Sequence, residues 1–103
     1  ASNYLTMEKF CEFRVHEYMD LHPHKKVRTF IADDEPAIEK AARDWAKVMS
    51  EMYSGGPTRF VKIMTKEEAE AHVKEVCDYE DKHPQEDSEA FKQEMWNLVY
   101  KCY

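Results

Sequence analysis

Residues 33–53 read DDEPAIEKAARDWAKVMSEMY and decide the fold, because no other stretch of the chain carries so clear a helical pattern. An Asp at position 33 or 34 can cap the free amides of a helix start, and Pro36 suits a first helical turn. Apolar residues then recur at intervals of three and four and form one stripe: Ile38, Ala41, Ala42, Trp45, Val48, Met49 and Met52. The following Gly55-Gly56-Pro57 ends the pattern. The stretch predicts an amphipathic helix that lays its stripe on a sheet.

Three segments around this helix have the composition of strands. Residues 9–19 alternate apolar and polar side chains, and residues 26–32 are rich in branched and aromatic ones. The loop at residues 20–25 between them contains Pro23 and has a length typical of an antiparallel hairpin. Residues 59–64 form the third strand, and we expect Val61 and Ile63 to face away from Phe60. If the second and third strands are parallel neighbours, the sheet is mixed.

Two further helices are expected after the third strand. Thr65 and Glu68 form a capping-box pattern at the start of the first, whose predicted buried stripe is Ala69, Val73, Val76 and Cys77. His83-Pro84 interrupts this helix, and the next runs from about residue 86 to residue 100. The predicted fold is therefore a single α+β domain over residues 1–103, in the order ββαβαα. Residues 1–6 are expected to be a disordered end or a remnant of processing.

The composition narrows the class of protein. The 103 residues are 43% hydrophobic with only two glycines, which argues against disordered and low-complexity chains. No apolar run approaches the length of a membrane span. The chain lacks the glycine-rich phosphate loops, the GxSxG motif and the HExxH motif, so the sequence gives no sign of an enzyme and implies no cofactor. Three widely spaced cysteines without a CxxC pair favour a reducing, cytoplasmic location, while one disulfide with one free thiol is the alternative.

The net charge of −6 is concentrated in one stretch. Residues 66–89 contain ten acidic residues and three lysines, whereas acidic and basic residues cancel before this stretch. Such a surface repels phosphate, so direct binding to nucleic acid is not expected, and it attracts basic partners. The plainer explanation is a solvated helix face that keeps the protein soluble.

These observations predict a non-enzymatic interaction module or small inhibitor that engages a basic protein surface, one version of which imitates the charge of nucleic acid. Aromatic residues beside the acids would add to the docking surface, because aromatic side chains often dominate interface energies. The candidate binding residues are Glu67, Glu70, Glu75, Asp78, Tyr79, Asp81 and Trp96. A homodimer is compatible with this function and with the alternative below, since edge strands and surplus aromatic residues offer routes to self-association.

The alternative function is a metal-binding small enzyme or sensor. Asp20, His22 and His24 alternate along the predicted loop between the first two strands, so an extended loop would present a carboxylate and two imidazoles to one side. A divalent transition metal would need at least one further ligand from elsewhere in the chain. The competing interpretation is a solvated polar turn.

Overall fold

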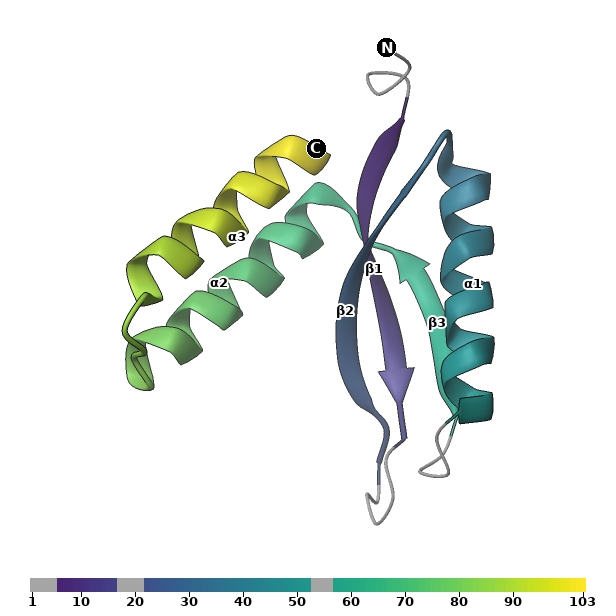
Figure 1. Cartoon of the computed structure of the whole chain (residues 1–103), viewed down its shortest axis with the longest axis horizontal. Helices are drawn as coiled ribbons and strands as arrows, with labels where there is room; N and C mark the ends of the chain where they lie inside the picture. The colour runs from purple at the N-terminus through teal and green to yellow at the C-terminus, as the bar shows by residue number, and fades with distance from the viewer. Residues whose placement is uncertain (1–5, 17–21, 53–56) are drawn as a thin grey trace. The chain divides into compact units, whose positions relative to one another are not determined.

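The computed structural model describes residues 6–16, 22–52 and 57–103. The elements follow in the order β1 (Met7–Val15), β2 (His24–Ala32), α1 (Glu35–Met52), β3 (Thr58–Ile63), α2 (Lys66–Lys82) and α3 (Ser88–Cys102), as Figure 1 shows. The predicted ββαβαα order of an α+β fold is therefore confirmed. The chain divides into two compact units, residues Ala1–Ile63 and Met64–Tyr103. That the whole chain forms a single domain stays a prediction.

The sheet of the first unit is entirely antiparallel, with the strand order β2-β1-β3. The prediction of a mixed sheet was wrong, because it depended on β2 and β3 being neighbours. The helix α1 does connect two strands that point the same way, but β1 lies between them and pairs antiparallel with both. The two strands that α1 connects, β2 and β3, thus form the two edges of the sheet.

One face of the sheet carries the core of the first unit. Phe13 is fully buried, and its ring packs edge-on against Trp45 of α1 at 4.7 Å and Phe60 of β3 at 5.8 Å, with Phe30 of β2 at 5.9 Å. The buried residues of this core are Cys11, Phe13, Ile38, Ala42, Ala46 and Phe60. Part of the predicted apolar stripe of α1, including Ile38, Ala42 and Trp45, therefore packs on the sheet, whereas Val48 and Met52 stay exposed.

A β-bulge changes which residues of β3 face the core. The register passes from Glu12–Lys62 to Phe13–Phe60, so that Val61 is the extra residue on β3. Phe60 and Ile63 consequently both pack in the core cluster. The prediction that they face opposite ways was wrong, because strict alternation holds only in a strand without a bulge.

Short polar contacts fix the ends of α1. The Ala37 amide donates to Oδ1 of Asp34 at 2.9 Å, which confirms an aspartate cap at the helix start. Near the other end, the Ser50 hydroxyl donates to the Ala46 carbonyl at 2.8 Å and accepts from the Thr58 amide at 2.8 Å. Ser50 thus ties the last turns of α1 to the first residue of β3.

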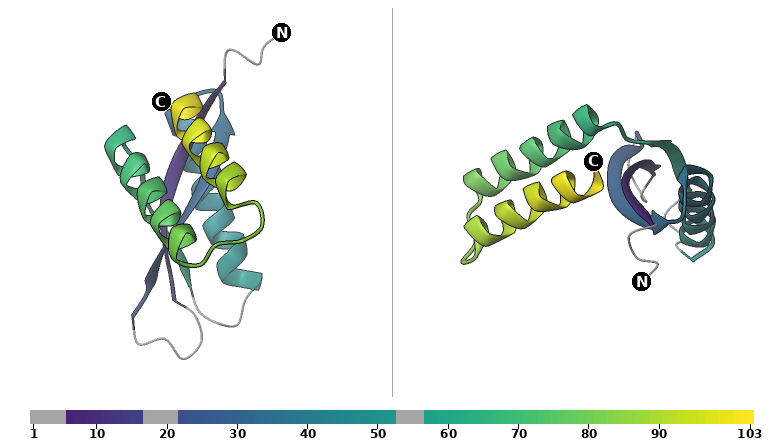
Figure 2. Two further views of the ribbon diagram at one scale, coloured as in Figure 1. Left: turned by 90° about the vertical axis from the view of Figure 1, so that its left-hand side faces the viewer. Right: turned by 90° about the horizontal axis from the view of Figure 1, so that it is seen from above.

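The second unit is a helical hairpin in which α2 and α3 run side by side in opposite directions (Figure 2). The predicted capping box is present: the Glu68 amide donates to Thr65 Oγ1 at 3.2 Å, and the Thr65 amide donates to Glu68 Oε1 at 2.9 Å. At the turn, the Ser88 hydroxyl donates to the Glu80 carboxylate at 2.7 Å. At the open end, the Tyr103 hydroxyl donates to the Met64 carbonyl.

Two smaller differences concern the ends of elements. The first strand stops at Val15, short of the predicted residue 19, and β2 begins at His24 instead of residue 26. The third helix is displaced by two residues, to Ser88–Cys102. Residues 1–5 and the two glycines before Pro57 lie outside the described residues. Within the described residues, no helix combines the length and the apolar character that crossing a bilayer requires.

Candidate functional site

The helix α2 has one buried side and one exposed side. Ala69, Val73 and Cys77 recur every four residues and are 0–8% exposed, so they form the buried side. Because successive residues of a helix are about 100° apart, Glu67, Glu75 and Asp78 point away from this side, and all three are exposed. Glu70 lies at its border and is half-buried. The four carboxylates thus share one side of α2, which we call the acidic side.

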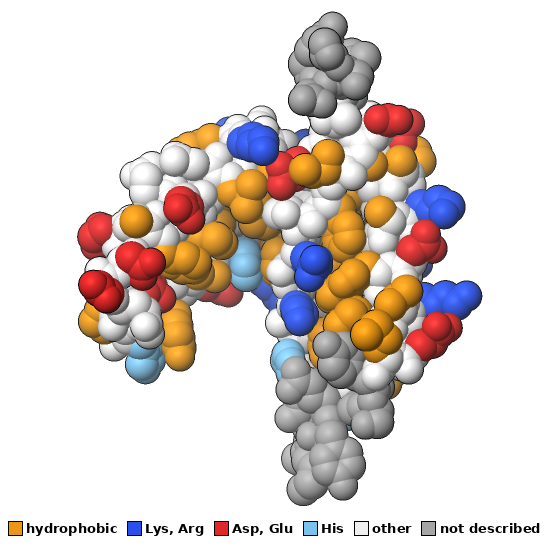
Figure 3. All heavy atoms as spheres, in the orientation of Figure 1, with side chains coloured by type: hydrophobic (Ala, Val, Ile, Leu, Met, Phe, Trp, Pro, Cys, Tyr) orange, Lys and Arg blue, Asp and Glu red, His pale blue; other side chains and the backbone are white. Residues whose placement is uncertain are grey.

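The carboxylates of the acidic side are not neutralised by the chain's own cations. None of Glu67, Glu70, Glu75 and Asp78 forms an ion pair or a side-chain hydrogen bond with another described residue. Lys74 and Lys82 lie on the same exposed side, but neither is within salt-bridge distance of these acids. Figure 3 shows acidic side chains distributed over the hairpin with hydrophobic side chains between them. The acidic side therefore carries four carboxylates without an ion pair among the described residues, beside two lysines.

Asp81 differs from the other acids because its carboxylate is already engaged. Lys92 of α3 donates to Asp81 Oδ1 at 2.5 Å and to Glu89 Oε1 at 2.9 Å. The hydrogen bond to Asp81, followed by that to Glu89, raises the pKa of Lys92 above its ordinary value. Asp81 thus connects the C-terminal end of α2 to α3, and its charge is balanced inside the hairpin.

The two candidate aromatic residues flank the acidic side. Tyr79 is 63% exposed, and its ring stacks on that of His83 at 4.4 Å. Trp96 of α3 is half-buried, stacks on Tyr100 at 6.1 Å and hydrogen-bonds to Cys77. Cys77 and Tyr79 are two residues apart and so lie on nearly opposite sides of α2. Tyr79 accordingly adjoins the acidic side at Glu75, four residues before it, while Trp96 sits at the other border, beside Cys77.

The residues of the metal hypothesis are only partly placed. Asp20 lies outside the described residues. His22 is exposed in a bend, and His24 is the first residue of β2, where it pairs with Val15. Over residues 6–16, 22–52 and 57–103, no three His, Cys, Asp or Glu side chains come close enough to hold a metal ion. Metal binding at this turn stays a prediction.

All three cysteines are free and buried. Burial raises the pKa of the Cys11 thiol to about 11. Burial also raises the pKa of Cys77, although Lys92 and the hydrogen bond from Trp96 act in the opposite direction. Since the thiolate is the nucleophilic form, buried thiols of this kind are poor nucleophiles. The cysteines therefore act as small apolar side chains in this fold.

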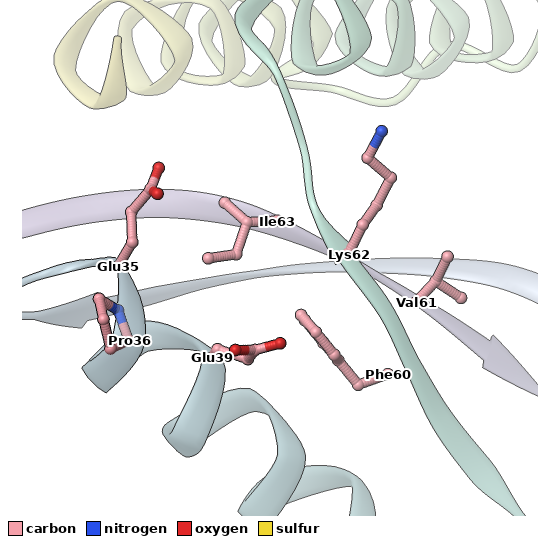
Figure 4. Close-up of a pocket in the computed structure, with 7 residues that line it drawn as sticks. All are labelled: Glu35, Pro36, Glu39, Phe60, Val61, Lys62 and Ile63. Carbon is pink, nitrogen blue, oxygen red and sulfur yellow. The ribbon is translucent and has the colours of Figure 1, made fainter.

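An open pocket of about 380 Å³ lies between the start of α1 and β3 (Figure 4). Glu35, Glu39 and Lys62 supply its charged groups, and the lining is completed by Pro36, Phe60, Val61 and Ile63. Glu39 is paired with Arg43 at 3.0 Å, so one of the pocket's two carboxylates is already balanced. Val61, the extra residue of the bulge, lies in this wall, and the alternation of the strand alone does not predict a pocket there. Its lining contains no cysteine, histidine or hydroxyl nucleophile.

A basic and aromatic surface on the first unit was also not foreseen from the sequence. Lys26 and Arg28 of β2 lie over the indole ring of Trp45, at 5.8 and 5.1 Å from its centre. The alternation of β2 places both cations on one side of the strand, and that signal was present in the sequence. What could not be read was that Trp45, seventeen residues after Arg28, lies beneath them.

Comparison of the chain with protein-family models, with curated protein sequences and with solved structures gives no match in any of the three searches.

Proposed function

We propose that this chain is a non-enzymatic interaction module that binds a basic protein surface through the acidic side of α2. The observation that supports it most directly is the set of four carboxylates with no ion pair among the described residues, Glu67, Glu70, Glu75 and Asp78. A carboxylate without an ion pair can bind a cation of a partner without first breaking a contact inside its own chain. Tyr79, exposed beside Glu75, adds apolar contact area to the same surface.

The density of charge favours a basic protein surface over close imitation of nucleic acid. From Glu67 to Asp78 the helix rises roughly 17 Å, at about 1.5 Å per residue. Duplex DNA presents about ten phosphates over this length, at one charge per about 1.7 Å. The acidic side presents four carboxylates, and Lys74 and Lys82 offset part of their field. A partner that is only moderately basic is therefore the better match.

The test uses a fluorescently labelled oligoarginine peptide as the basic probe and follows its anisotropy at low and high salt. One variant neutralises the acidic side by isosteric changes: Glu67→Gln, Glu70→Gln, Glu75→Gln and Asp78→Asn. A control removes the same number of charges from exposed, unpaired positions elsewhere: Glu35→Gln, Glu51→Gln, Glu86→Gln and Glu94→Gln. The two variants have equal net charge and differ only in where that charge lies.

Binding at low salt, weakening at high salt and loss in the first variant alone are the expected results. An exposed ion pair contributes roughly 0.2–1 kcal/mol, so removing four should weaken binding at least about fourfold. Equal affinities of the two variants would show that only net charge matters and would refute the proposal. Displacement of the protein from the probe by duplex DNA would show that both ligands compete for the same cations.

A further inference from the structure

The edge strand β2 and the neighbouring side of α1 form one continuous surface of mixed character. Lys26 and Arg28 are both exposed and cover the ring of Trp45. Val48 and Met52 follow Trp45 by three and seven residues, so they lie on the same side of α1. Together these five residues are called the Trp45 patch. In the orientation of Figure 3, basic side chains adjoin hydrophobic ones over β2 and α1.

The apolar stripe of α1 is wider than the part of it that packs against the sheet. Ile38, Ala42 and Ala46 are buried against the strands, whereas Val48 is 47% and Met52 69% exposed. Large apolar side chains that remain exposed next to one another often mark contact surfaces for another protein. The same helix thus uses one part of its stripe for the core and leaves another part in solvent.

The cations of the Trp45 patch, like the carboxylates of the acidic side of α2, are not neutralised by other described residues. Neither Lys26 nor Arg28 forms an ion pair with another described residue, although both make cation–π contacts with Trp45. The acids of α1 do not pair with these cations: Glu39 pairs with Arg43, Asp44 pairs with Lys40, and Glu35 and Glu51 form no ion pair with another described residue. Each unit therefore carries unpaired charges of one sign on a defined surface, and the two signs are opposite.

The spacing of the two surfaces is compatible with direct contact. Lys26 and Arg28 are two residues apart on a strand, which separates their backbones by about 7 Å. Glu75 and Asp78 are three residues apart on a helix, where side chains lie about 5–6 Å from one another. Long lysine and arginine side chains readily bridge this small difference. Tyr79, four residues after Glu75, would then meet the apolar part formed by Val48 and Met52.

We propose that the Trp45 patch of one copy of the chain receives the Glu75–Tyr79 part of α2 from a second copy. This inference rests on the proposed function, since it names a basic surface that the acidic side binds. The two contacting surfaces are different, so copies can associate either reciprocally or head to tail. Reciprocal exchange between two copies closes a dimer, whereas exchange with successive copies extends a chain. The measured mass distinguishes these two forms of self-association.

The test is sedimentation velocity of the full chain over a range of concentrations, at low and high salt. Two charge-reversed variants are compared: Lys26→Glu with Arg28→Glu, and Glu75→Lys with Asp78→Lys. A control, Lys47→Glu with Arg59→Glu, makes the same charge change as the first of these variants, at exposed cations without an ion pair among the described residues. Far-UV circular dichroism verifies that each variant retains its helices. The decisive sample is an equimolar mixture of the two charge-reversed variants, because each restores the complement of the other.

Wild type and control are expected to associate as concentration rises, and high salt should weaken this association. Each reversed variant alone should raise the dissociation constant at least about tenfold, and the mixture should associate again. A wild type that stays monomeric at every concentration overturns the inference, as does a mixture that does not associate. If the monomeric wild type still binds the oligoarginine probe, the proposed function stands without self-association. If it fails to bind the probe, the proposed function has failed as well.

Discussion

Substitution of Phe13 is the sharpest test of how the first unit is held together. The side chain is fully buried at the centre of β1, and its ring contacts three other rings, those of Phe30, Trp45 and Phe60. Replacing a buried phenylalanine by alanine removes apolar burial and leaves a cavity, which costs about 3–5 kcal/mol. Phe13→Leu keeps most of the apolar volume but loses the ring contacts. Since one such contact is worth roughly 0.5–1.5 kcal/mol, we expect this variant to lose about 1–3 kcal/mol.

The measurement is urea unfolding followed by tryptophan fluorescence. The chain has two tryptophans, Trp45 in the first unit and Trp96 in the second. In a Trp96→Phe background the signal therefore reports on the first unit alone. The control is Met52→Ala, which truncates a side chain that is 69% exposed and should change the free energy of unfolding by no more than about 0.5 kcal/mol.

A loss below about 1 kcal/mol in Phe13→Ala, well under the range for buried aromatic residues, would refute the assignment of Phe13 as the centre of the core. A loss equal to that of the Met52→Ala control would do the same. In the same Trp96→Phe protein, far-UV circular dichroism follows the helices of both units and also tests the single-domain prediction. Transitions that coincide by fluorescence and by circular dichroism fit one cooperative domain, and separated transitions contradict it.

Three other outcomes follow from local contacts. Thr65→Ala should lower the free energy of unfolding by about 1 kcal/mol, because it removes the side-chain acceptor of the capping box, and circular dichroism during thermal unfolding measures this. Lys92→Met should strengthen binding of the oligoarginine probe, because it releases the carboxylate of Asp81, and an unchanged affinity would show that Asp81 has no access to the probe. The pKa of Cys11 rises from 9.0 to about 11 on folding, so the native state prefers the neutral thiol. This contribution is complete below about pH 9 and is lost as the pH rises towards 11, and Cys11→Ala should flatten the fall in stability over that interval.

The parts of the fold that were predictable from the sequence are those whose determinants are close together in the chain. The helix α1 follows from an aspartate cap and a periodic stripe, and α2 follows from Thr65 and Glu68, three residues apart. These signals act within one or two turns and need no knowledge of the tertiary fold. The order of elements could therefore be assigned even though no match to a known protein supports it.

The sheet order and the bulge depend on contacts between distant residues. A crossover helix is compatible with parallel neighbours and also with a strand inserted between them, and only the pairing of β1 with both β2 and β3 decides. The bulge at Val61 likewise exists only because β3 must match β1. Period-two reasoning cannot detect an extra residue in one strand, which is why Phe60 and Ile63 were expected on opposite faces.

The candidate site shows the same division between local and distant information. Helical spacing alone is enough to place Glu67, Glu75 and Asp78 on the side of α2 opposite Ala69, Val73 and Cys77, and all three are exposed. The ion pair of Asp81 with Lys92 joins residues eleven apart, one on α2 and one on α3, and no periodic pattern predicts it. Lys26 and Arg28 were read only as part of a strand, because their significance depends on the ring of Trp45 beneath them.

Charge and apolar area have different roles in the association proposed for the Trp45 patch. Exposed ion pairs contribute only about 0.2–1 kcal/mol each, whereas bringing two proteins together costs on the order of 4–15 kcal/mol. The pairs formed by Lys26 and Arg28 therefore cannot sustain a complex alone. Burial of Val48, Met52 and Tyr79, which are 47–69% exposed, has to supply most of the affinity. Charge then selects which surfaces meet and in which register, so Met52→Ala should weaken the complex at every salt concentration, while salt should act only through the ion pairs.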